Sequence, residues 1–220
     1  YINFTLQKKV LSMKEEKEYI KDLSDIREMM ERSSRFLSLS GLAGVLSGIY
    51  AIAGAFIAYS VFGFNPDSID YIPSGADNHD TGVVNVVLVA ISILVLALAT
   101  VVFLSGRNAS KRGEKLWNNS SRRLLANMSV PLATGGIIII IFIFKNLVGL
   151  VAPASLIFYG LALSGAGRLT LSEVRYLGIT QIILGIAGFI FIPYSLVIWV
   201  LGFGFVNIVY GIYMHYKYEK

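Results

Sequence analysis

The chain has 220 residues, of which 55% are hydrophobic and 15% are charged, and its mean hydropathy is +0.66. Soluble domains carry about 25% charged residues, so this composition excludes an ordinary water-soluble protein. The sequence contains no cysteine, which excludes disulfide bonds, thiolate metal sites and cysteine nucleophiles. The formal net charge is +5, and its distribution along the chain indicates membrane topology rather than nucleic-acid binding.

The first 34 residues are polar and precede the apolar part of the chain. Residues 1–12 lack the order of basic and apolar residues that defines a secretory signal peptide, and Met13 resembles a natural start. We therefore expect residues 1–12 to be an upstream or added extension. Residues 13–34 combine apolar side chains at helical spacing with charges of both signs. They predict an amphipathic cytoplasmic or interfacial helix, with a partner-binding or dimer helix as the alternative.

Two apolar runs in the first half of the chain are each long enough to cross a membrane once. Residues 36–62 carry no charged side chain, and neither do residues 83–104. Uncharged apolar runs of about 18 residues or more are typical of membrane-spanning helices. Each run therefore predicts one span.

Two longer apolar regions, 130–166 and 177–214, each predict a pair of spans. The first has 37 residues, and a single helix of that length would measure about 55 Å, whereas the hydrocarbon core is about 30 Å thick. We expect a tight turn at Lys145–Asn146 in the first region and another at Pro193 in the second. The count of spans is then six.

The six spans form three consecutive pairs, 36–104, 130–166 and 177–214, and each pair follows a basic segment. The stretch RFLSLSGLAG (35–44) has an echo in RYLGITQIILG (175–185). We predict an all-α membrane protein with a six-transmembrane-helix bundle. The echo adds the hypothesis of three repeated helical hairpins with pseudo-threefold symmetry about the membrane normal.

The distribution of Lys and Arg predicts the orientation of the spans. Segment 105–128 holds six Lys or Arg residues and one Glu, whereas segment 63–82 holds four Asp residues and no Lys or Arg. Basic residues accumulate in cytoplasmic loops. We expect the membrane domain, 35–214, to lie in the bacterial inner (plasma) membrane with both termini cytoplasmic. Residues 215–220 would form a cytoplasmic tail, and Lys145 would lie on the outer side.

Small residues at a spacing of four predict where helices approach each other closely. Gly44 and Gly48 form a GxxxG pattern in the first span, and Gly160 and Ser164 have the same spacing in the fourth. Lipid offers no hydrophobic drive for helix association, so membrane helices pack through such small residues. The pattern indicates close packing or an oligomer interface and does not indicate a catalytic or binding residue.

Three polar residues are the candidates for a path through the bundle. Lys145 is expected at a turn, where its ammonium can extend to the membrane surface, and this reading competes with a functional lysine inside the membrane. Gln181 and Asn207 belong to the fifth and sixth spans, where they can face each other and form hydrogen bonds between helices. In a channel or transporter, the same residues would line the path.

Residues for catalysis or metal binding are not evident. The expected spans contain no Asp or Glu, and both His residues lie outside them, which argues against proton-coupled transport and intramembrane hydrolysis. The stretch DNHD (77–80) matches no established metal motif and is better explained as a polar loop. We expect no catalytic residue, no metal ligand and no cofactor, and hence no enzyme.

Several stretches together resemble an uncharacterised family of bacterial multi-pass inner-membrane proteins. They are IREMMERSSRFLSLSGLAGVLSGIYA (26–51), WNNSSRRLLANMSVPLATGG (117–136), LIFYGLALSGAG (156–167), VRYLGITQIILGIAGFIF (174–191) and VLGFGFVNIVYGIYMHYKYE (200–219). The resemblance implies a membrane location and supplies no activity or binding residue. The last hairpin, from GITQIILGIAGFIFIP onward, is also faintly similar to acid-resistance membrane proteins of the HdeD type.

The functional hypothesis is a non-enzymatic scaffold, accessory or envelope-stress module of the inner membrane. Its amphipathic N-terminal helix and basic inner loop would contact anionic lipid of the inner leaflet or a cytoplasmic partner. A homo-oligomer or a membrane-protein partner fits the small-residue faces, and no nucleic-acid partner is expected. The alternative is a small channel or transporter for an unidentified solute.

Overall fold

The computed structural model describes residues 40–64, 79–111, 117 and 119–218. The chain divides into two compact units, residues 1–35 and 36–220, and all described residues belong to the second. The expected extension at 1–12 and the expected amphipathic helix at 13–34 lie outside the described residues. Of the stretch 77–80, only the backbone of residues 79 and 80 is described, and it begins a helix.

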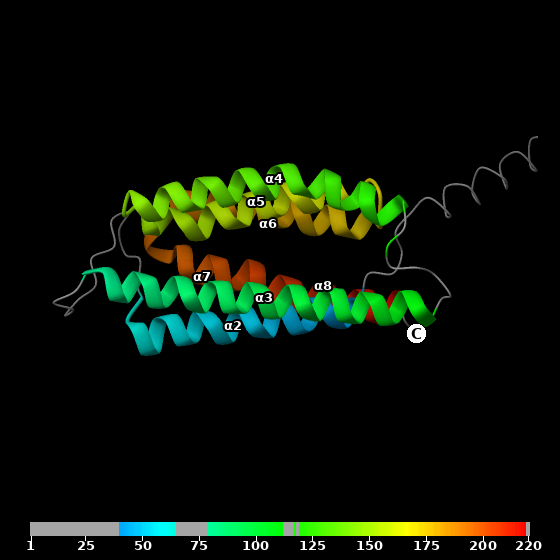
Figure 1. The fold of residues 1–220 in the computed structure, drawn as a ribbon, viewed down its shortest axis with the longest axis horizontal. Helices are drawn as coiled ribbons and strands as arrows, with labels where there is room; N and C mark the ends of the chain where they lie inside the picture. Colours follow the sequence, from blue (N-terminus) through cyan, green and yellow to red (C-terminus); the bar gives the residue numbers. More distant parts are fainter. Residues whose placement is uncertain (1–39, 65–78, 112–116, 118, 219–220) are drawn as a thin grey trace, which may run out of the picture. The chain divides into compact units, whose positions relative to one another are not determined.

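The described residues form an all-helical membrane domain, shown in Figure 1. Six of its segments are long and apolar enough to cross a membrane, which confirms the predicted six-helix fold. The elements are α2 (Gly41–Phe62), α3 (His79–Lys111), α4 (Asn119–Phe144), η1 (Val148–Leu150), α5 (Val151–Ala166), α6 (Ser172–Ile190), η2 (Ile192–Tyr194), α7 (Ser195–Trp199), η3 (Val200–Val206) and α8 (Asn207–Tyr218). The last span is continuous from η2 to α8, and η3 within it is π-helical.

Both predicted tight turns are present. Asn146 has a positive φ of 59°, a conformation that Asn tolerates better than most residues. The amide of Leu147 donates to the carbonyl of Phe142 at 2.8 Å, which closes the end of α4 in the manner of a Schellman motif. Pro193 lies in the short helix η2 between α6 and α7. Each turn therefore uses a residue that suits a helix break.

The third span begins earlier than predicted. We expected its first residue at 130, but α4 starts at Asn119 and continues through Pro131. The prediction followed the end of the charged segment, whereas the helix is stabilised by what it buries. Leu124 is buried in a cluster with Leu163 of α5, and Met128 packs against the same cluster. The arginines of this first part of α4 remain exposed, so charge did not limit the helix.

The three expected hairpins are present as consecutive helix pairs, but they contact one another unequally. Pairs α2–α3 and α4–α5 pack internally, and α6 packs against α7 and η3. The second and third hairpins share an extensive contact between α5 and α6, while the first contacts the third through α2. The first hairpin meets the second through a small cluster of Ala58, Phe64 and Val86 with Val148 of η1, and the described helices of these two hairpins make no substantial backbone contact. This arrangement does not follow threefold symmetry.

Glycines allow the closest of these helix contacts. A methyl group placed on Gly160 of α5 would lie 2.6 Å from the carbonyl oxygen of Gly178 in α6, and a methyl group on Gly178 would lie 2.6 Å from that of Gly160. Between α2 and the last span, a methyl group on Gly48 would lie 2.7 Å from the carbonyl oxygen of Gly204. Two glycines of the predicted small-residue patterns, Gly48 and Gly160, thus lie at helix contacts, as expected for membrane helices.

Replacing Gly160 with alanine should destabilise the domain by about 1–3 kcal/mol, because the added methyl group has no room against α6. Gly165→Ala is the matched control on the same helix, since nothing lies within 4 Å of the added methyl group. Alanine also favours a helix over glycine, so the control should be neutral or stabilising. The free energy of unfolding in detergent measures both, and equal losses in the two variants would contradict the α5–α6 contact.

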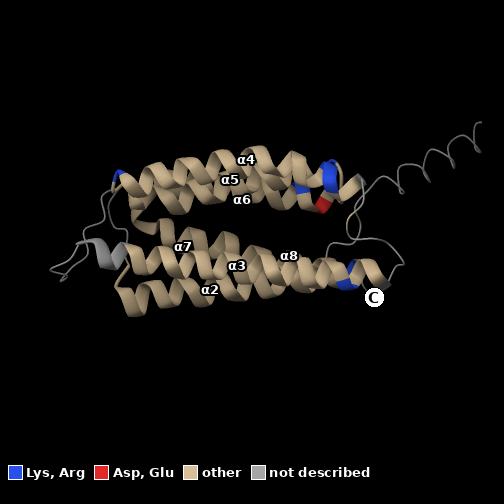
Figure 2. Ribbon diagram, in the orientation of Figure 1, with Lys and Arg blue, Asp and Glu red and all other residues tan. Residues whose placement is uncertain are grey.

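The described basic residues lie at one end of the helices, with a single exception, as Figure 2 shows. The exception is Lys145, in the turn between α4 and η1. Because consecutive spans run in opposite directions, the other basic residues occupy connected helix ends: Arg107, Arg122, Arg123, Arg168, Arg175 and Lys217. The charge asymmetry on which the orientation was predicted is therefore a property of the folded domain.

Single cysteines can test the orientation, because the natural chain has none. With both termini cytoplasmic, Lys145→Cys should react with a membrane-impermeant maleimide in intact spheroplasts. Arg168→Cys should react only in inverted vesicles. Both positions are exposed, so a lack of labelling would not result from burial. Labelling of Arg168→Cys in spheroplasts would reverse the predicted orientation.

Candidate functional site

Two of the three predicted path residues, Gln181 and Asn207, bond to the same segment, η3, and the third, Lys145, lies in the turn between α4 and η1. Lys145 is exposed in the turn that precedes α5. Gln181 lies in α6, is fully buried and donates a hydrogen bond from Nε2 to the carbonyl of Gly202 at 2.9 Å. Asn207 begins α8 and donates from Nδ2 to the carbonyl of Phe203, one turn earlier in its own helix, at 3.0 Å. The bonds of both amides go to the main chain.

Both of these acceptor carbonyls belong to η3. A π-helical segment shifts the backbone bonding pattern by one residue, and inside a membrane the backbone groups that this frees must find partners within the protein. Gln181 and Asn207 each supply one side-chain donor to η3. Their role in this structure is therefore to support the π-helical segment, with Gln181 also joining α6 to the last span.

Aromatic side chains hold the same segment against α5. The ring of Phe203 lies 4.9 Å from that of Tyr159 and 5.0 Å from that of Trp199, measured between centroids. Trp199 donates from Nε1 to Ser155 Oγ at 3.0 Å. Offset and tilted ring pairs at these distances are favourable. The π-helical segment is thus fixed by both hydrogen bonds and ring packing.

The second polar atom of Gln181 has no hydrogen-bond partner in the described part of the chain. Its Oε1 is buried, and a methyl group placed on Gly202 would lie 2.6 Å from it. A glycine at position 202 therefore leaves the room that the amide needs. An unpaired buried oxygen lowers the net stability gained from the Nε2 bond.

Replacing Gln181 with methionine should change the free energy of unfolding by no more than about 1.5 kcal/mol, because the lost hydrogen bond is offset by removal of the unpaired oxygen. Gln181→Glu is the matched comparison, of nearly equal size. It should cost more than about 3 kcal/mol at neutral pH, because the carboxylate lacks a donor for the Gly202 carbonyl, and holding the acid protonated inside the bundle also costs free energy. A well-tolerated glutamate at neutral pH would contradict the buried, water-free position of this side chain.

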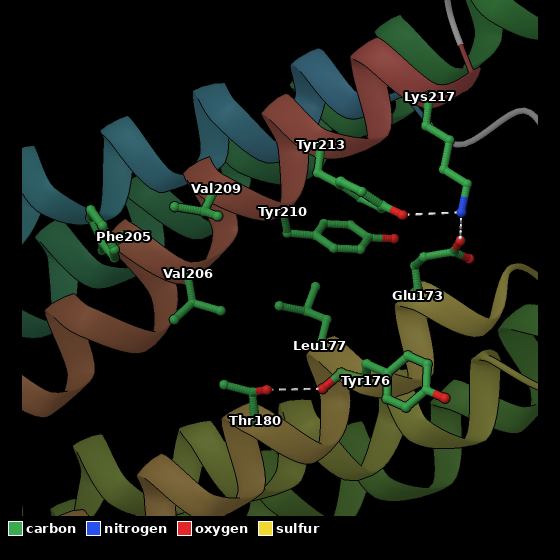
Figure 3. A pocket seen from close by; sticks show the side chains of 10 residues that line it. All are labelled: Glu173, Tyr176, Leu177, Thr180, Phe205, Val206, Val209, Tyr210, Tyr213 and Lys217. Atoms are coloured by element: carbon green, nitrogen blue, oxygen red, sulfur yellow. Dashed lines mark hydrogen bonds and ion pairs between the residues drawn. The ribbon is translucent and has the colours of Figure 1, made fainter.

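A groove between α6 and the last span was not predicted from the sequence. It has a volume of about 650 Å³ and is shown in Figure 3. Its lining comes from both helices: Glu173, Tyr176, Leu177 and Thr180 of α6, Phe205 and Val206 of η3, and Val209, Tyr210, Tyr213 and Lys217 of α8. The groove exists because α8 packs against α2 and makes no substantial backbone contact with α6.

Charged and phenolic groups close one end of this groove. Lys217 donates from Nζ to Glu173 Oε1. The same Nζ also donates to the hydroxyl oxygen of Tyr213 at 3.0 Å. The hydroxyl of Tyr218 donates to the same Glu173 oxygen at 2.9 Å. Lys217 is 44% exposed and Glu173 is 14% exposed. We name these four residues, Glu173, Tyr213, Lys217 and Tyr218, the polar cap.

One signal in the sequence could have indicated the polar cap. Glu173 is the sole acidic residue between Glu114 and Glu219, and it lies in the first turn of α6. An isolated acid beside a membrane helix is a reason to look for a cation. Its partner, Lys217, lies 44 residues later, and no local pattern in the sequence connects the two.

Within the described residues, no group of three His, Asp or Glu side chains could hold a metal ion. The groove offers one carboxylate, one ammonium and several phenols, which can bind a polar or charged group. Comparisons with models of known protein families, with curated proteins and with solved structures find no match to this chain.

Proposed function

We propose that this multi-pass membrane protein is non-enzymatic and acts through contacts within the membrane, as a scaffold, accessory or envelope-stress module of the bacterial inner membrane. The observation that carries the proposal is the use of the polar side chains inside the bundle. Gln181 and Asn207 bond to backbone carbonyls of η3, and Lys145 lies at a turn. These residues serve the fold, whereas a transport path needs polar groups that are free for a solute.

The position of the charges supports the same proposal. The described Lys, Arg and Glu side chains lie in the first or last two turns of the helices or in connections between them. The middle of each described span carries no ionisable side chain other than tyrosine. Pumps and carriers instead place acids, histidines or lysines inside their spans. The uncharged middle favours a protein whose spans serve as contact surfaces.

The outer helices provide such surfaces. Among the substantial contacts of the described elements, α3 packs against α2 alone, and α4 packs against α5 and η1. In the most apolar part of α3, none of the described residues is buried. In this proposal, a second copy of the chain or another membrane protein packs on α3 or α4. The basic end of the helices would meet anionic lipid of the inner leaflet.

Purified protein in liposomes or planar bilayers should show no KCl conductance and no release of entrapped calcein above the protein-free background. A channel-forming peptide added to the same bilayers is the positive control. The channel or transporter alternative predicts flux that falls in the double variant Gln181→Leu/Asn207→Leu. Such flux in the natural chain, with that loss in the variant, would overturn the proposal.

A further inference from the structure

We propose that the groove between α6 and the last span binds one phospholipid with a zwitterionic head group that carries both a phosphate and an amine. The acyl chain would lie along the apolar wall, and the head group would insert into the polar cap. This inference goes beyond the proposed function, because it stands whether or not a protein partner packs on the outer helices.

The apolar wall of the groove suits an acyl chain. Below the polar cap, Leu177 lies on one side and Val206 and Val209 lie on the other, as Figure 3 shows. The hydroxyl of Thr180 is also in the wall, but it donates to the carbonyl of Tyr176 in its own helix at 3.0 Å. The Thr180 hydroxyl is therefore already bonded, and the wall favours an apolar ligand group.

The size and the exposure of the groove suit a single acyl chain. Its volume of about 650 Å³ falls within the range of small-molecule sites, roughly 300–1,000 Å³. Several wall residues are exposed on the outer surface of the helices, among them Thr180, Phe205 and Val209, so a chain can enter sideways from the bilayer.

The polar cap lies at the level where phospholipid head groups begin. Glu173 is in the first turn of α6, and Lys217 is in the last turn of α8, at the ends of the two candidate spans. Tyrosines gather beside them, as they do where membrane proteins meet the head groups. An acyl chain in the groove would therefore have its own head group beside the cap.

The charges of the cap select the head group. One carboxylate and one ammonium neutralise each other across the mouth of the groove. A phosphate–amine head group can replace both partners, because its phosphate accepts from Lys217 and its amine donates to Glu173. Tyr213 accepts a bond from Lys217 and keeps its own proton for a phosphate oxygen. An anionic head group without an amine would leave Glu173 facing negative charge.

The head group must also supply most of the selectivity. Lipid tails are as apolar as the leucine and valine side chains of the wall, so moving an acyl chain from the bilayer into the groove gains little. Charge-assisted hydrogen bonds at the cap are stronger than neutral ones. Head-group chemistry, rather than chain length, should therefore decide which phospholipid is retained.

The test uses the full chain in nanodiscs that contain equal amounts of phosphatidylethanolamine and phosphatidylglycerol with identical acyl chains. Native mass spectrometry gives the ratio of the two lipids retained by the protein. The natural chain should keep one phosphatidylethanolamine in preference. Glu173→Gln should lower the ratio roughly tenfold, because the amine loses its charged acceptor. Lys145→Gln, an exposed charge outside the basic end of the helices, is the charge control and should leave the ratio unchanged.

A steric pair of variants locates the lipid independently of charge. Val209→Trp fills the groove and should remove the bound lipid, whereas Ile212→Trp adds the same bulk to an exposed position of α8 outside the lining and should retain it. The proposal is overturned by preference for phosphatidylglycerol in the natural chain, by no retained lipid, or by equal ratios in Glu173→Gln and the natural chain. It is also overturned if both tryptophan variants behave alike.

Discussion

Two glycines of the π-helical segment η3 allow other helices to approach the last span from two sides. A methyl group on Gly202 would collide with Leu156 of α5 and with the amide of Gln181, whereas one on Gly204 would collide with Ile52 of α2. The last span is therefore the element through which the first hairpin joins the α5–α6 pair. Since lipid provides no hydrophobic drive for association, these close approaches carry the packing of the domain.

The divergence of α8 from α6 follows from that arrangement. The part of the last span that precedes η3, α7, packs against α6. The part that follows η3, α8, packs against α2. A methyl group on Gly41 of α2 would lie 2.5 Å from the carbonyl oxygen of Gly211 in α8, and a methyl group on Gly211 would lie 2.5 Å from that of Gly41. This contact draws α8 toward α2, and the polar cap then spans the opening between α8 and α6. The groove is therefore present because the last span contacts α6 in its first part and α2 in its last part.

The polar residues of the membrane interior acquire their roles from the backbone. Backbone groups inside a membrane must find partners within the protein, and the side chains of Gln181 and Asn207 donate to two carbonyls of the π-helical segment. The ionisable groups that could recognise a ligand lie instead in the terminal turns, at the polar cap. Structure and recognition are thus separated along the length of the spans, which is consistent with binding at the membrane surface.

The sequence by itself determined the number of spans, the turns at Asn146 and Pro193, and the asymmetry of charge, because hydropathy, backbone preference and charge act locally or by simple counting. Only the tertiary structure decided that α4 extends back to Asn119, since that extension depends on burying Leu124 against another helix. It also decided that Gln181 bonds to the main chain of η3 rather than to Asn207. The pairing of Glu173 with Lys217 joins residues 44 positions apart, and it arises from how the helices pack, which no spacing in the sequence records.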